Sequence, residues 1–223
     1  MNVTARARAV RPERSTLLWG AVLVNTELLL LFAYVLLSPN EIVDWLPTLV
    51  PFVWINVGLW AIVRTRPAPS SSRQRRVATL IAVGYFLVLA YFGGLIGPGQ
   101  ASQFTGSRVV LFSIPPGWSP AVIAITEFVS VTLIPFKAIG YVALAYLVYA
   151  TVLDASGSAV SGVLGLLSCV SCTWPVIASL VTGVVGGTTA VAGAVYSQSY
   201  ALSTVVFVAT VALLYWRPFR FRG

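Results

Sequence analysis

Histidine is absent from this chain of 223 residues, which holds two cysteines and no methionine after Met1. A four-coordinate zinc site would need two ligands beyond the cysteines, and haem ligation by the usual histidine or methionine is excluded within the chain. Phosphate-binding glycine loops, the H-E-x-x-H pattern and serine-elbow motifs are also missing, which disfavours an ATP-driven or hydrolytic enzyme. We predict no metal site and no resident cofactor.

Charge is scarce as well. Only 9% of the residues are charged and 58% are hydrophobic, whereas a soluble domain typically carries about 25% charged residues. The polar surface needed to face water is therefore missing, and we expect a lipid bilayer to be the solvent. The net charge of +8 could suggest nucleic acid. However, the arginines flank apolar runs, where anionic lipid headgroups would meet them, so we predict lipid partners and no nucleic acid.

The apolar residues fall into runs long enough to cross a membrane, since the hydrocarbon core requires roughly 20 residues of helix. The six runs cover about 16–37, 42–63, 77–97, 119–152, 158–184 and 190–216. They predict an all-α polytopic membrane protein, a six-helix transmembrane bundle spanning 16–216. A basic N-terminal segment (1–15) and a basic tail (217–223) flank this domain.

The lysines and arginines predict the orientation. Twelve of the 14 fall at the two ends of the chain or in the loop RTRPAPSSSRQRRV, between the second and third runs. Because cytoplasmic segments are enriched in these residues, we expect both termini in the cytoplasm and a multi-pass location in the cell membrane. Only Arg108 falls outside, in a segment (98–120) long enough to fold as a cap on the membrane surface.

The fourth run is too long for one upright crossing. Ser119 and Pro120 form a good cap and first-turn pair for a helix. Pro135 is predicted to kink that helix near its middle, because it cannot donate a backbone hydrogen bond. Lys137 would then lie near mid-depth.

Ionisable residues inside a membrane usually face a partner or a wet cavity. Glu27 lies at the centre of the first run, at a depth similar to that expected for Lys137, and we predict that the two side chains approach each other. Asn25 and Asn56 are expected in the same polar cluster. Glu127 lies roughly 15 Å from Lys137 along a helix, too far for those two to pair directly. The cluster could be a proton or substrate relay, or a structural ion pair.

The two cysteines, Cys169 and Cys172, occur in the stretch LLSCVSCTWPVIASL. Residues three apart share one face of a helix, at a separation that a disulfide can bridge. If the helix breaks at Pro175 and restarts there, the positive end of the new half-helix would favour a thiolate near Cys172. The pair could therefore be redox-active, with a lipid-soluble quinone as its electron partner.

Two other readings of the pair stay open. The cysteines lie in a seam of serine and glycine residues spaced three and four apart, typical of close helix packing. Two thiolates could also hold Cu(I). The spacing alone does not choose among redox, packing and metal.

The run CVSCTWP loosely resembles the intramembrane cysteine motifs of CcdA-like and vitamin K epoxide reductase-like thiol-transfer proteins. That resemblance implies thiol transfer by Cys169 and Cys172. The chain departs from both patterns, since CcdA-like proteins carry one cysteine in each half and the other family uses additional loop cysteines. As a whole, the arginine-rich, Ala/Val/Gly-rich chain resembles uncharacterised multi-pass membrane proteins of high-GC archaea, which implies a membrane location and no activity.

Three classes of function follow. A small transporter would use the Glu27/Lys137 cluster, an accessory or assembly subunit would use its helix faces, and a thiol-disulfide oxidoreductase would use Cys169 and Cys172. We expect one of the first two, because the sequence shows spans and packing surfaces without a complete catalytic set. A membrane-protein partner or a homo-oligomer is the expected association.

Overall fold

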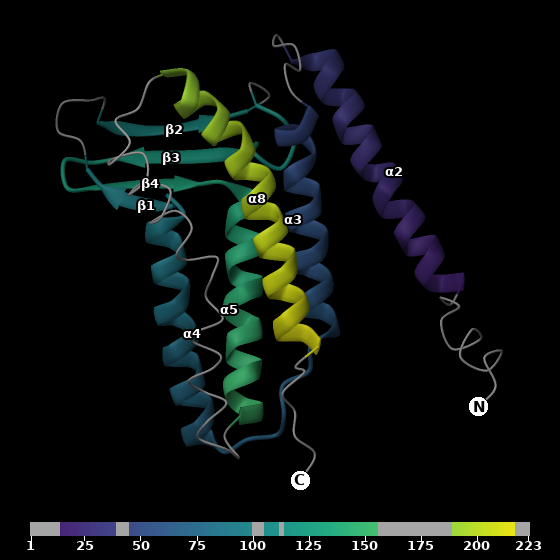
Figure 1. Ribbon diagram of the computed structural model, residues 1–223, viewed down its shortest axis with the longest axis vertical. Coiled ribbons are helices and arrows are strands. Elements are labelled where there is room, and N and C mark those ends of the chain that lie inside the picture. The colour runs from purple at the N-terminus through teal and green to yellow at the C-terminus, as the bar shows by residue number, and fades with distance from the viewer. Residues whose placement is uncertain (1–13, 39–44, 100–104, 112–113, 156–188, 217–223) are drawn as a thin grey trace.

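The computed structural model describes residues 14–38, 45–99, 105–111, 114–155 and 189–216 (Figure 1). Five helices and four strands are found in these ranges. In chain order they are α2 (Arg14–Leu37), α3 (Trp45–Arg64), α4 (Ser72–Phe92), β1 (Ile96–Pro98), β2 (Gly106–Val110), β3 (Ala121–Ile125), β4 (Val129–Leu133), α5 (Pro135–Ala155) and α8 (Thr189–Trp216).

Four of the helices are long and apolar enough to cross a membrane. Their apolar segments in α2, α3, α4 and α5 contain 20 or 21 residues each, which corresponds to about 30 Å of helix. Within α8, a shorter apolar helix is described over Ser203–Tyr215. This architecture is compatible with membrane association.

The prediction of an all-α, six-helix bundle is wrong. The structure contains a four-stranded antiparallel sheet with the strand order β1-β4-β3-β2. The segment 119–134, predicted as the first part of the fourth helix, instead supplies β3 and β4. The fifth predicted run, 158–184, lies outside the described residues.

Local chemistry explains why this segment forms strands. The sequences AVIAI and VSVTL are rich in β-branched side chains, which favour extended backbone. Between them, the backbone N–H of Thr126 donates to the carbonyl of Val129 at 2.9 Å, and the hydroxyl of Thr126 donates to the same carbonyl at 2.7 Å. Glu127 and Phe128 therefore form the tip of a tight hairpin, and this hairpin is as apolar as a membrane helix.

Pro135 is the first residue of α5, so it does not kink a longer helix. Proline suits this position because the first helical N–H groups have no partner inside the helix. The next N–H, from Phe136, donates to the carbonyl of Gly117 at 3.1 Å. The helix start predicted at Ser119 and Pro120 is therefore wrong, since these residues belong to the turn before β3.

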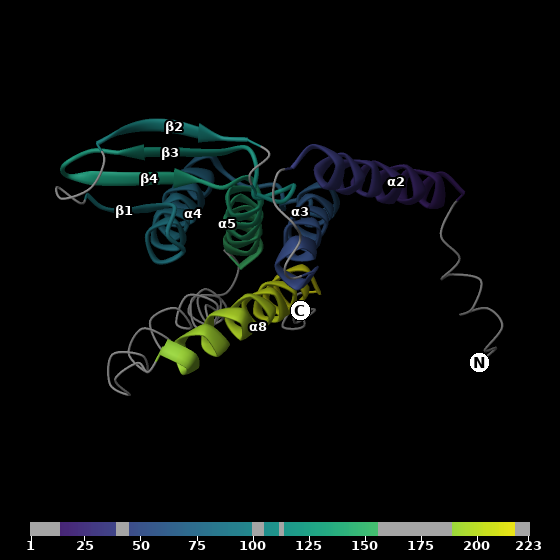
Figure 2. The same cartoon turned by 90° about the horizontal axis from the view of Figure 1, so that it is seen from above.

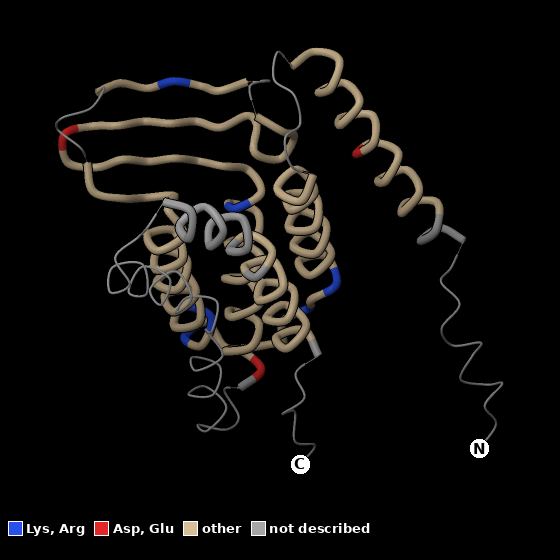
Figure 3. The backbone as a smooth tube through the Cα atoms, turned by 45° about the horizontal axis from the view of Figure 1, so that its top comes forward, with Lys and Arg blue, Asp and Glu red and all other residues tan. Residues whose placement is uncertain are grey.

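The sheet lies across one end of the helices, as the two perpendicular views show (Figures 1 and 2). β1 follows α4 directly and β4 leads into α5, so the strand pair extends a pair of neighbouring helices. Arg64, at the end of α3, and Arg73, Arg75 and Arg76, in the first turns of α4, lie at the opposite end, whereas Arg108 lies in β2 (Figure 3).

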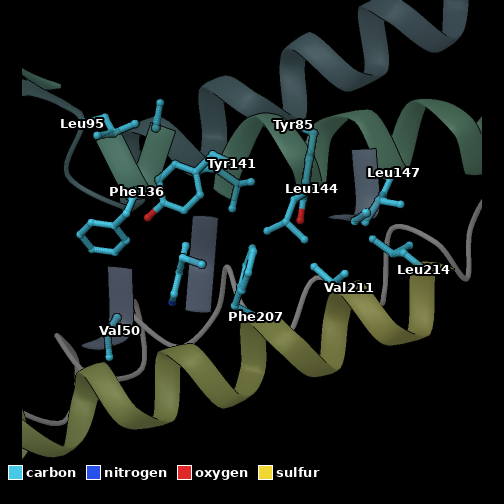
Figure 4. Close-up of a cluster of buried hydrophobic side chains, with 14 residues drawn as sticks. Val50, Tyr85, Leu95, Phe136, Tyr141, Leu144, Leu147, Phe207, Val211 and Leu214 are labelled. Atoms are coloured by element: carbon cyan, nitrogen blue, oxygen red, sulfur yellow. The ribbon is translucent and has the colours of Figure 1, made fainter. Parts of the chain in front are cut away.

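The core is built from interlocking aromatic rings between α3, α5 and α8 (Figure 4). Trp54 of α3 stacks on Phe207 of α8, with ring centroids 4.1 Å apart and planes 5° apart. Phe136 and Tyr141 of α5 contact Trp54 edge-on at 5.6 and 5.9 Å. Gly140 makes this approach possible, because a Cβ atom there would overlap the indole ring.

Replacing Gly140 with alanine is therefore expected to destabilise the protein by about 1–3 kcal/mol, the usual cost of overpacking a core. The midpoint of thermal unfolding in detergent micelles would measure the loss. Gly84→Ala is the matched control, since no atom lies within 4 Å of a Cβ placed there in the exposed part of α4. Equal midpoints for Gly140→Ala and the parent chain would contradict this account of the core.

Candidate functional site

A polar contact joins the middle of α2 to the middle of α3. Asn56 donates a hydrogen bond from Nδ2 to Oε1 of Glu27 at 2.6 Å. Only 6% of the residues in the apolar segment of α2 are buried, so this helix contributes little to the core. A carboxyl group and an amide within apolar helices are expensive to leave unpaired. The bond between Glu27 and Asn56 therefore attaches α2 to α3 through a polar contact.

Lys137 lies at a different place from the one predicted. It is in the first turn of α5, at the sheet end of the helices, because α5 begins only two residues earlier. Its Nζ donates to the carbonyl oxygen of Gly93 at 3.0 Å, and Gly93 is the C-cap residue of α4. An ammonium group at the C-terminal end of a helix complements the negative end of the helix dipole. Lys137 thus fastens the end of α4 to the start of α5.

The predicted polar cluster is consequently divided. The structure joins Glu27 to Asn56 and does not bring Lys137 to Glu27. Asn25 lies on an exposed part of α2, and its side chain forms no hydrogen bond to the residues that the structure describes. Glu127 is exposed at the tip of the β3–β4 hairpin, beyond the ends of these two strands (Figure 3). Cys169, Cys172 and Pro175 lie outside the described residues.

Two further contacts at the arginine-bearing end were not predicted from the sequence. Asp154, near the end of α5, accepts a hydrogen bond from the backbone N–H of Ala68 at 3.1 Å. The hydroxyl of Tyr146 donates to the carbonyl of Thr65 at 3.2 Å. These bonds hold the loop between α3 and α4 against α5. The sequence feature that could have indicated these contacts is Asp154, an acidic residue at the end of an apolar run.

Indole groups make a second set of polar contacts that sequence reasoning missed. Trp54 donates from Nε1 to Oγ1 of Thr204 at 3.0 Å, and Trp118 donates from Nε1 to the carbonyl of Pro47 at 2.9 Å. Trp118 also packs edge-on against Phe136, with centroids 4.7 Å apart. Each indole thus buries its ring and satisfies its N–H. Within the described ranges, no three His, Cys, Asp or Glu side chains gather into a metal-binding group.

These features define a helical protein with four membrane-length helices and an antiparallel sheet at one end. The chain belongs to a family of unknown function (DUF7546), whose model matches residues 1–221. Searches of curated proteins and of solved structures return no match. The family description carries no activity, so the resemblances to thiol-transfer proteins and to archaeal membrane proteins stay predictions.

Removing the amide of Asn56 is expected to destabilise the attachment of α2 more than neutralising Glu27. Asn56→Leu leaves the carboxyl group without its donor, at a cost of about 1–3 kcal/mol. Glu27→Gln keeps an acceptor oxygen for Asn56 and should cost less than about 1 kcal/mol. Unfolding in mixed micelles with increasing SDS would compare them, with Val53→Leu as the control at an exposed position of α3. A larger loss in Glu27→Gln than in Asn56→Leu would refute the assignment.

Substitutions at Lys137 and at Glu27 should change the free energy of unfolding independently of each other. Lys137→Met removes the hydrogen bond to Gly93 and should cost about 1.5–3 kcal/mol, the range for bonds made by charged groups. Combined with Glu27→Gln, the two losses should add to within about 0.5 kcal/mol, because the residues share no partner. The same SDS titration measures all three variants. A coupling energy above about 1 kcal/mol would restore the ion pair that the sequence predicted.

Proposed function

We propose that this protein is a multi-pass protein of the cell membrane that acts as an accessory or assembly subunit, by binding another membrane protein. The observation that carries the proposal is the filled interior of the described helices. Trp54, Phe136, Tyr141 and Phe207 interlock where α3, α5 and α8 meet, so this region is a packed core. Function would then depend on exposed surfaces, which include the sheet and the outer face of α2.

A transport function has less support than the role of an accessory or assembly subunit. A transporter that used Glu27 and Lys137 as one polar path would need them together. In the structure Glu27 is bonded to Asn56, and Lys137 is bonded to the end of α4. The thiol oxidoreductase is a separate alternative, which depends on Cys169 and Cys172.

The positive-inside rule assigns a side to each surface. The ends of α3 and α4 that bear the arginines would face the cytoplasm, and the sheet would lie on the opposite side of the membrane. An extramembrane domain of a partner could reach the sheet there.

One face of the sheet has the character of a protein contact. Cross-strand pairing aligns Val109 with Val122 and Val122 with Leu133, and it places Val131 on the same face. These four side chains are between 38% and 58% exposed. The charged Arg108 pairs with Ile123 and therefore belongs to the other face. We call Val109, Val122, Val131 and Leu133 the sheet face, and its partner would offer an apolar extramembrane surface.

Photo-crosslinking in native membranes tests this proposal. A benzophenone amino acid at Val122 should yield an adduct of defined mass with a different membrane protein. The same group at Ile123, on the opposite face, should yield at least several-fold less of that adduct. Labelling of lipid alone from Val122, or equal labelling from both positions, would contradict a subunit role for the sheet face.

A further inference from the structure

The second exposed surface is the side of α2 that faces away from α3. Leu18, Val22, Asn25, Leu29, Phe32 and Leu36 follow one another at alternating spacings of four and three residues. At 100° per residue they lie within about 40° of a common line along the helix. The five apolar members are between 56% and 67% exposed. We call these six residues the α2 stripe.

The attachment to α3 lies on the opposite side of the helix. Glu27, which is bonded to Asn56, and Tyr34, which is 5% exposed, are separated from the centre of the stripe by about 160–180° around the helix axis. α2 lies at the edge of the molecule in both perpendicular views (Figures 1 and 2). The stripe is therefore directed away from the other described helices and from the sheet.

Asn25 makes this stripe incompatible with a purely lipid surrounding. Its amide is exposed, and it forms no hydrogen bond to any described residue, whereas the neighbouring Thr26 satisfies its hydroxyl at the carbonyl of Val22 at 2.8 Å. Two residues from Glu27, it lies at nearly the same depth near the middle of the helix. An amide in hydrocarbon without partners costs several kcal/mol. The side chain therefore requires both a donor and an acceptor that the described residues do not supply.

We propose that a second copy of this chain covers the α2 stripe, with the two α2 helices parallel and Asn25 hydrogen-bonded to Asn25 across a two-fold axis. This inference rests on the proposed placement of α2 in the membrane. All copies then have the same orientation, so the axis of a symmetric dimer runs along the membrane normal and identical residues face each other. An amide pair is self-complementary, because each side chain donates one hydrogen bond and accepts one.

The spacing of the stripe fits this arrangement. Apolar residues at alternating steps of four and three form the seam of a left-handed helix pair, and a polar side chain on such a seam can hydrogen-bond to its equivalent in the other helix. The spacing of the stripe and the position of Asn25 therefore both favour a parallel partner helix with the same sequence.

Neighbouring leucines provide a matched test. Leu29 lies on the stripe and Leu30 lies about 100° away, and the two are 62% and 51% exposed. A benzophenone amino acid at Leu29 should give a covalent dimer of this chain in native membranes, and the same group at Leu30 should give several-fold less. Adducts of Leu29 with a different protein, with lipid alone, or in equal yield with Leu30 would each overturn the proposal.

Asn25 itself supplies the second arm of the test. Asn25→Leu should weaken dimerisation about three- to fifteenfold for each interhelical hydrogen bond lost, and Asn25→Gln, which keeps the amide, should restore most of it. Energy transfer between labelled chains in liposomes measures both variants, and an unchanged thermal midpoint shows that each variant folds. Unchanged dimerisation in Asn25→Leu would overturn the role of the amide. The sheet-face adducts, measured in the same membranes, report separately on the subunit function.

Discussion

The contact between Gly140 and the indole ring of Trp54 determines how three of the helices lie relative to one another. Since Gly140 has no side chain, α5 can approach the indole ring of Trp54 closely, while Phe207 of α8 stacks on that ring. The indole N–H reaches Thr204, which fixes the rotation of α8 as well as its distance. The position of α5 in turn determines where β4 ends, and with it the attachment of the sheet.

Several polar groups within the described apolar helices are hydrogen-bonded inside the chain. Glu27 and Asn56 satisfy each other, and Trp54 satisfies Thr204. Threonine hydroxyls, such as that of Thr210, bond to the backbone one turn earlier in the same helix. In a medium without water this is the expected pattern, because every unsatisfied group is costly. Asn25 has no hydrogen-bond partner among the described residues, and it lies on the exposed side of α2 that is directed away from α3.

Hydropathy predicted the helices better than it predicted the sheet. A run of about 20 apolar residues has few alternatives to a helix in lipid, and α2, α3 and α4 begin and end within about five residues of their predicted limits. The segment 121–133 is equally apolar, so hydropathy could not separate a hairpin from a helix. The alternation in VSVTL and the proline at position 135 were the discriminating signals.

Misplacing the helix start also misplaced Lys137, and the predicted ion pair with Glu27 depended on that error. The contacts of Trp54 could not have been predicted, since they depend on the rotation of helices far apart in the sequence.

The pairing of β1 with β4 has a mechanical consequence. Three residues separate α4 from β1, and only Ile134 separates β4 from α5, so short connections join the strand pair to the two helices. Lys137 clamps the helices together at that end, and Asp154 holds the α3–α4 loop against α5 at the other. α4, β1, β4 and α5 therefore form one continuous unit, in which a displacement of the strand pair would also displace the helices that continue it.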